Sequence, residues 1–182
     1  MVYEPKLDVR GRVLATLRID DWRDVHRHLV RLLGFEVPGM RTALAFYESD
    51  LAEDFPRPNA DALSELLGID FHSPVCREIL EPGRIMACHV KPGGEGERAR
   101  VGGFLTRPGT GLDMLGLQGS PRRMVRVSTL EAIPALHSRV AATVDTWSDP
   151  DRKAWLAMGR GEQWRIPKSA TRDGRLHVPI LH

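Results

Sequence analysis

The sequence predicts an α+β fold, in which a mostly antiparallel sheet is flanked by helices from the N- and C-terminal thirds of one domain. Three stretches support this prediction. Residues 20–68 have helical periodicity, residues 76–127 contain short apolar or alternating runs bounded by Pro and Gly, and residues 129–158 return to helical periodicity. Segregated helices and strands are typical of α+β proteins, whereas a parallel α/β sheet would alternate them.

Length and composition place the chain among globular proteins. Its 182 residues, 42% hydrophobic and 27% charged, suffice for one domain with a core, here residues 1–182. No apolar run approaches the roughly 18 residues of a membrane span, and the N-terminus does not resemble a secretory signal. Two cysteines do not make a disulfide framework. These features predict a cytoplasmic protein without a membrane partner.

The N-terminal third is expected to contain one strand followed by three helices. Residues 9–19 alternate between two faces with a period of two, which indicates a strand. A helix over 21–33 is expected between the N-cap Asp21 and the C-terminal stop Gly34. Pro38 begins a second helical pattern, and Asn59 caps a short helix over 60–67 that Gly68 ends.

The central block is expected to supply most of the sheet. Five runs of four to six residues have strand character: Cys76–Leu80, Ile85–Val90, Val101–Leu105, Met114–Leu117 and Met124–Val127. Gly and Pro separate them, and residues 92–97 are expected to connect a hairpin.

The C-terminal third is expected to be helical, with a wrapped tail. Ser128 and Glu131 have capping-box spacing, which predicts a helix over 129–147. Its buried stripe would be Leu130, Ile133, Leu136, Val140 and Val144. A short helix through about residue 158 and a tail over 160–182, with one edge strand, would follow. The predicted core is Trp22, Val25, Leu29, Leu136, Val140 and Val144.

Charge is distributed unevenly along the chain. The net charge is −4 over residues 1–70 (nine basic, thirteen acidic), +1 over 71–120 (six and five) and +5 over 121–182 (eleven and six). The basic rear suggests an anion-binding surface formed by Arg122, Arg126, Trp164, Arg165 and Lys168. Alternatively, these cations pair internally with the acids at 48–54. Twenty-two of the 26 basic residues are arginine, which is also the composition of a GC-rich, bacterial-like genome.

Thiols and imidazoles supply the candidate catalytic groups. His72, Cys76 and His89 are candidates because a Cys beside a His is the minimal activated nucleophile. Against this stands the interpretation of Cys76 and Cys88 as small buried hydrophobes. The Cys and His spacing does not match a closed zinc site, so no metal is expected. The glycine loops lack phosphate-loop order, so no cofactor is expected either.

Composition and motifs do not fix a chemistry. The favoured function is a cytosolic binding or accessory protein whose basic C-terminal third contacts an anionic partner, either a nucleic acid or an acidic protein. One alternative is a small enzyme, a hydrolase or transferase, with a His/Cys cleft between sheet and helices. A protein–protein interaction module, including a homo-oligomer that buries exposed tryptophans, is another. Folding could also unite isolated titratable residues: Asp113, His137, Asp145 and His177.

Overall fold

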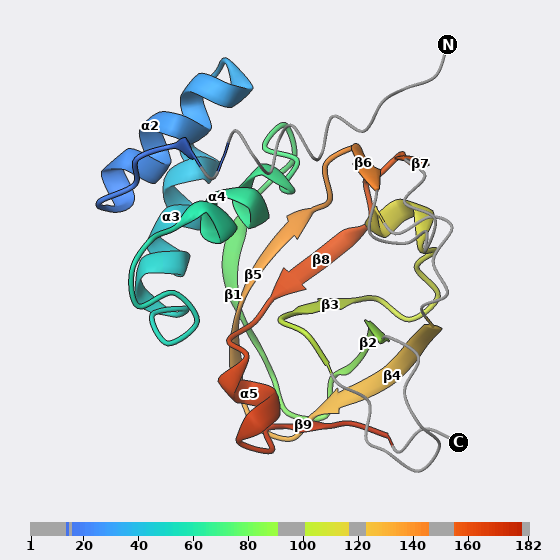
Figure 1. Cartoon of the computed structure of the whole chain (residues 1–182). Helices are drawn as coiled ribbons and strands as arrows, with labels where there is room; N and C mark the ends of the chain where they lie inside the picture. Colours follow the sequence, from blue (N-terminus) through green and yellow to red (C-terminus); the bar gives the residue numbers. More distant parts are fainter. Residues whose placement is uncertain (1–13, 15, 91–100, 117–122, 146–154, 180–182) are drawn as a thin grey trace.

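The computed structural model describes residues 14, 16–90, 101–116, 123–145 and 155–179 of the chain. In this part of the chain, an antiparallel sheet of seven strands lies against a layer of helices (Figure 1). The predicted α+β class with a mostly antiparallel sheet is therefore confirmed. Among the residues described, there is no helix whose length and apolar character would let it cross a bilayer.

The helices are α2 (Trp22–Leu33), α3 (Pro38–Ser49), α4 (Ala60–Leu67), the short α5 (Ser169–Arg172) and a 3₁₀ turn η1 (Asp113–Leu115). The strands of the large sheet are β1 (Cys76–Leu80), β2 (Ile85–Val90), β3 (Phe104–Thr106), β4 (Arg123–Thr129), β5 (Ile133–Arg139), β8 (Glu162–Arg165) and β9 (Leu176–His177). Their order is β1-β5-β8-β3-β2-β4-β9, and β6 (Thr143–Asp145) pairs separately with β7 (Trp155–Ala157).

Local capping signals define the helical layer, as the sequence predicted. The Asp21 side chain accepts hydrogen bonds from the first turn of α2, and Gly34 ends this helix with φ of 80°. Asn59 accepts from the Ala62 amide at the start of α4. The predicted helices over 21–33 and 60–67, and the helix beginning at Pro38, are all confirmed.

The large sheet is strongly curled. Only four residues connect Leu80 to Ile85, although three strands lie between β1 and β2 in the sheet order. In a flat sheet these two strands would be about 19 Å apart. Five extended residue steps span at most about 17 Å, and this connection contains a turn. The sheet must therefore bend around until the end of β1 approaches β2, as Figure 1 shows.

Curling gives the sheet an outer face, covered in part by α2–α4, and an inner face. Leu136 of β5 points outward and is buried in the core between the helices and the sheet. Ala135 of the same strand points inward, into a second apolar core with Trp164 of β8. Side chains alternate along a strand, so the position of one residue in either core shows which face the next residue of that strand points to.

The predicted helix over 129–147 is wrong across its described residues, 129–145, which contain the end of β4, then β5 and β6. Strand β5 lies between β1 and β8 and is buried on both faces, by the helical layer at Leu136 and by the inner core at Ile133. Burial on both faces removes the period-two alternation and leaves apolar residues at helix-like spacing. Pro134 lies beyond the segment of β5 that pairs with β8, where its missing donor costs least.

Four further predictions need correction. Leu14 and Thr16 have helical backbone, so the predicted strand 9–19 is wrong there, and most of its other residues lie outside the described part. Strand 114–117 is replaced by η1. Trp155–Ala157 forms β7 rather than the end of a helix. The tail supplies the edge strand β9, as expected, but Glu162–Arg165 is a central strand. The expected hairpin connection over 92–97 is not among the described residues.

The predicted core is largely correct even where the predicted element was wrong. Val25, Leu29 and Leu136 are fully buried and Val140 is 7% exposed, whereas Trp22 is half-buried against the outer core. The side chain of Val144 lies outside the description. Leu130, predicted in the same stripe, is 55% exposed because it follows the end of β4.

Two leucines from the same predicted helix should respond differently to truncation. We expect Leu136→Ala to lower the free energy of unfolding by about 2–5 kcal/mol, because it leaves a cavity in the outer core. Leu130→Ala should change it by less than about 0.5 kcal/mol, as at an exposed site. Urea denaturation monitored by circular dichroism measures both. Equal losses at the two positions would contradict the strand assignment and restore the helical stripe.

Candidate functional site

The proposed anion-binding set does not form one surface. Trp164 is 1% exposed and Arg165 is 2% exposed, so neither can contact a nucleic-acid backbone or an acidic protein. Arg126 and Lys168 are exposed, and Arg122 lies outside the described residues. This prediction fails at β8 because a central strand buries its side chains on both faces.

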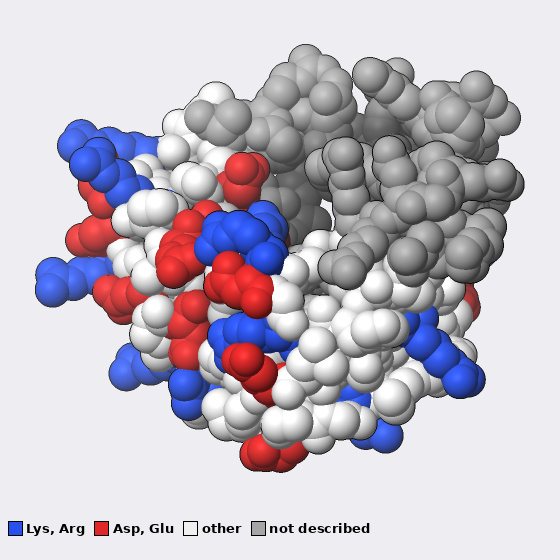
Figure 2. Space-filling view, turned by 90° about the horizontal axis from the view of Figure 1, so that it is seen from below, with Lys and Arg blue, Asp and Glu red and all other residues white. Residues whose placement is uncertain are grey.

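The basic rear instead pairs with the acidic end of the N-terminal helices. Arg165 lies 2.9 Å from Asp54 and donates to Glu65 over 2.8 Å. Arg172 pairs with Glu53 at the surface, and the uncharged backbone amide of Lys168 also donates to Asp54. Figure 2 shows acidic and basic side chains interleaved on one side of the molecule. Internal pairing, the alternative from the sequence, thus accounts for much of the charge asymmetry.

The thiols and imidazoles chosen from the sequence are dispersed. His72 is exposed and its ring lies 4.6 Å, between centroids, from that of Phe35, next to the helical layer. His89 lies on β2, separated from Cys76 on β1 by three strands of the sheet. Cys88 is buried, as the packing interpretation expects, whereas Cys76 is exposed. Of these residues, Cys76 alone belongs to the cluster described next.

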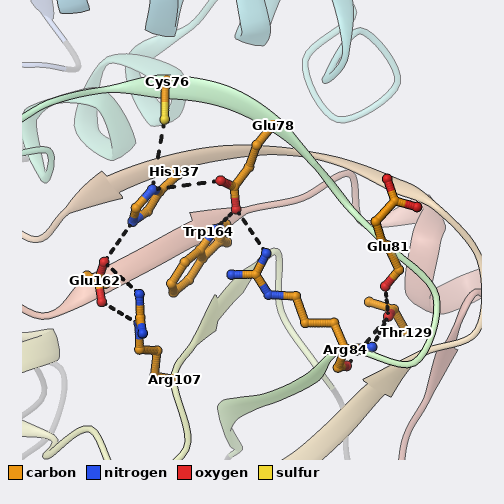
Figure 3. Close-up of polar contacts among 9 residues, drawn as sticks. All are labelled: Cys76, Glu78, Glu81, Arg84, Arg107, Thr129, His137, Glu162 and Trp164. Carbon is orange, nitrogen blue, oxygen red and sulfur yellow. Dashed lines mark hydrogen bonds and ion pairs between the residues drawn. The ribbon is translucent and has the colours of Figure 1, made fainter.

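A group of polar side chains converges on the inner face of the sheet, and we call it the inner-face cluster. It consists of Cys76 and Glu78 on β1, Arg84 in the β1–β2 turn, Arg107 after β3, His137 on β5, and Glu162 and Trp164 on β8 (Figure 3). Strand pairing places His137 opposite both Cys76 and Trp164. The cluster therefore lies on the opposite face from α2–α4, and the cleft expected between sheet and helices is not where these groups meet.

His137 is at the centre of the cluster. Its Nδ1 lies 3.9 Å from Cys76 Sγ and 4.0 Å from Glu78 Oε2, and its Nε2 lies 3.2 Å from Glu162 Oε1. The ring stacks on Trp164, with centroids 4.4 Å apart and planes inclined by 2°. Stacking and the Glu162 contact fix the ring so that Nδ1 faces the thiol and the carboxylate of β1.

Each carboxylate of the cluster is held by a cation. Glu78 Oε1 accepts from the indole nitrogen of Trp164 and from Arg84, which leaves Oε2 directed at His137. Glu162 accepts from Arg107, at 3.2 Å for one of the contacts. Both guanidinium groups also lie over the Trp164 ring. Trp164 and Arg84 thus fix the position of Glu78, and Arg107 fixes that of Glu162. None of these three is among the groups that face one another at Cys76, Glu78 and His137.

The environment shifts the pKa values of the two thiols and of Glu162. Burial and the nearby Glu78 carboxylate raise the pKa of the Cys76 thiol. Burial alone raises the pKa of Cys88 to about 12, so this thiol stays protonated. Burial also opposes ionisation of Glu162, but the hydrogen bond and charge of Arg107, with those of His137, lower its pKa. The Cys76 thiol therefore does not resemble a thiolate nucleophile.

Sequence reasoning missed most of the cluster. His137 appeared only as an isolated titratable residue, and Glu78, Glu162, Arg84 and Arg107 were not singled out. One local signal was present: on a strand, Cys76 and Glu78 are two residues apart and must share a face. Their partners are far away in the sequence: His137 is 61 residues from Cys76, and Trp164 is 86 residues from Glu78.

The fold resembles that of one chain in a solved complex. No protein-family model matches the chain, and no curated protein matches it. A chain in the structure of Tse6 in complex with Tsi6 is similar at a TM-score of 0.53 and 22% identity, over 79% of this chain and 98% of that one. A chain from Rhs1-CT in complex with its cognate immunity protein RhsI1 gives a TM-score of 0.37 and 17% identity, over 63% and 81%. At this identity, the first likeness shows the fold alone.

Removing the buried guanidinium should be far more damaging than removing an exposed one. We expect Arg165→Ala to cost about 3–5 kcal/mol of unfolding free energy, because it leaves Asp54 and Glu65 without their buried partner. Arg172→Ala, which removes an exposed pair with Glu53, should leave stability within measurement error. Thermal and urea unfolding measure both variants. A stable Arg165→Ala protein that had lost affinity for a polyanion would instead restore the anion-binding surface.

Proposed function

We propose that the protein is a small enzyme, a hydrolase or transferase, with its reaction centre at the inner-face cluster. The observation that supports this most strongly is the convergence of Cys76 Sγ, Glu78 Oε2 and His137 Nδ1, whose mutual distances are all within 4.8 Å. Thiol, carboxylate and imidazole are groups with which enzymes accept and donate protons. Here they come from two neighbouring strands, which are rigid supports.

The arrangement differs from the structural ion pairs of the same protein. Arg165 between Asp54 and Glu65 is a cation enclosed by anions, which is how a buried charge is stabilised. At the shared point of the cluster, a thiol and a carboxylate face an imidazole instead. Glu162 orients the imidazole, as the third group of a catalytic constellation does. Exposure of Cys76 leaves this point accessible to a substrate.

Substitution within the cluster should abolish turnover without unfolding the protein. The assay is a panel of chromogenic carboxylic, phosphoric and glycosidic esters, with and without an added amine or thiol acceptor. On any substrate that is turned over, Cys76→Ala, Glu78→Gln and His137→Asn should each reduce kcat/KM by at least about 10²-fold. Cys88→Ser, a change at the buried thiol of β2, is the matched control and should retain turnover. Equal turnover in the wild type and the three variants, or none from folded wild type on the whole panel, would contradict the proposal.

We also propose that the protein forms a complex with a second protein. The similar chain, of which 98% is matched, was solved in the structure of Tse6 in complex with Tsi6. In the sheet of described residues, β1 is an end strand, and edge strands present unpaired backbone groups to partners. Three aliphatic side chains near this end are exposed by 41–55%: Ile79, Ile85 and Leu130. Of the tryptophans whose side chains are described, Trp164 is buried and Trp22 is half-buried.

Site-specific photo-crosslinking tests this second proposal. A photoreactive amino acid in place of Ile79 or Ile85 should give one adduct of the same added mass from both positions, in cells that express the protein at native level. The same amino acid in place of Leu32, which is 44% exposed on α2, is the control and should not give that adduct. Identical adduct patterns from all three positions, or none, would count against a partner at the β1 edge.

A further inference from the structure

The geometry of the inner-face cluster points to a transition-metal site: we propose that Cys76 Sγ, Glu78 Oε2 and His137 Nδ1 bind one divalent ion, for which zinc is the best match. The inference deepens the proposed function and rests on the same reaction centre. Within the described residues, these three side chains are the group whose ligand atoms all lie within 4.8 Å of one another. Thiolate, imidazole and carboxylate are the donors that zinc takes in proteins.

The ligand atoms are close to the spacing that a tetrahedral ion requires. Zinc–ligand bonds of about 2.0–2.3 Å give separations of roughly 3.3–3.8 Å between ligand atoms. The structure has 3.9 Å between Cys76 Sγ and His137 Nδ1, and 4.0 Å between His137 Nδ1 and Glu78 Oε2. To reach zinc-binding separations, the sulfur–nitrogen distance must shorten by about 0.4 Å and the nitrogen–oxygen distance by about 0.7 Å. Rotations of the Cys76 and Glu78 side chains can supply these shifts without a change in the β1–β5 pairing.

The groups behind the ligands are those of a metal site. A histidine that binds a metal through one nitrogen almost always donates from the other to a carboxylate or carbonyl, which fixes its tautomer and orientation. Here Nε2 of His137 is 3.2 Å from Glu162, and Arg107 holds Glu162 in turn. Glu78 follows the same plan: Oε1 accepts from Trp164 and Arg84, and Oε2 remains for the ion.

Electrostatics favour a cation at the shared point. The forms in which Cys76 and Glu78 bind a metal are both anions that repel each other, and Arg84, on the other oxygen of Glu78, offsets only part of this repulsion. A divalent ion between them reverses this repulsion and displaces the thiol proton. The fold thus places a thiol, a carboxylate and an oriented imidazole around one point. This is the expected arrangement for holding an ion.

Three protein ligands would leave a coordination position open. Structural zinc sites have four protein ligands, whereas catalytic ones have three and keep the fourth position for water or substrate. Cys76 is exposed, so this position would be open to solvent. The predicted reaction class is therefore metal-assisted hydrolysis or group transfer, in which the ion activates water and polarises the electrophile.

Zinc binding by untagged protein tests the inference without any assay of activity. After dialysis against EDTA, isothermal titration with ZnCl₂ should give one equivalent for the wild type and for Cys88→Ser, with micromolar or tighter affinity. Cys76→Ser, Glu78→Gln and His137→Asn should each weaken binding by more than about 10-fold. Glu162→Gln keeps all three ligands and should weaken it by about 10–100-fold, as expected for a partner that orients a ligand. Circular dichroism must show that each variant is folded.

Alkylation provides a second measurement that reports on the ligand itself. In Cys88→Ser protein, Cys76 is the remaining thiol, and zinc should slow its reaction with iodoacetamide at least 10-fold. Magnesium, which prefers oxygen ligands, should have no effect. Equal zinc affinity in wild type and Cys76→Ser, or no binding at 100 μM zinc, would overturn the inference.

The two proposals fail separately. Cluster-dependent turnover that is insensitive to EDTA would leave the enzyme and remove the metal. Stoichiometric zinc binding that Cys76→Ser abolishes, without turnover on any panel substrate, would keep the metal site and remove the hydrolase or transferase assignment.

Discussion

The buried guanidinium of Arg165 is the interaction on which the rest of the structure depends. A charge that is 2% exposed is tolerated because Asp54 and Glu65 lie against it, and because Phe55 and Phe104 face the guanidinium. Gly103 lies beside it, and a Cβ there would overlap the Arg165 guanidinium and force it away from its partners. These contacts join β8 to the helical layer and fix which face of β8 points outward. By alternation, Glu162 and Trp164 must then point inward, where the cluster forms.

The curling of the sheet also helps to form the cluster. The short connection between β1 and β2 forces the sheet to bend, so that Arg84 in this connection reaches over the Trp164 ring and contacts Glu78. In a flat sheet, Arg84 could not reach the middle strands. The inner face thus has an apolar end, packed as a second core, and a polar end where β1, β5 and β8 present titratable groups. The curvature of the sheet therefore shapes both the fold and the candidate site.

The sequence predicted those features whose causes are local. Asp21 and Asn59 cap their helices through contacts three or fewer residues away, so the pattern was readable. Strand β5 was misread because packing on both faces, a property of the whole fold, determined its spacing of apolar residues. The cluster depends on contacts between residues that are far apart in the sequence. Cys76 and His137 are 61 positions apart, and Glu78 and Trp164 are 86 positions apart. Alternation placed Cys76 and Glu78 on one face, but only the sheet order supplied His137 and Trp164 as their neighbours.

Charge pairing within the fold changes where function should be sought. The acidic N-terminal third and the basic C-terminal third suggested a surface for an anionic partner. Arg165 and Arg172 show that much of this asymmetry joins the two thirds to each other. Complementary charges far apart in sequence help to specify one docking of helices on the sheet, because a wrong docking leaves buried ions unpaired. The cluster is different, because the thiol of Cys76 and the Glu78 oxygen that faces His137 do not join the helices to the sheet. Groups that the fold positions but does not use for this docking are the ones on which a ligand or substrate can act.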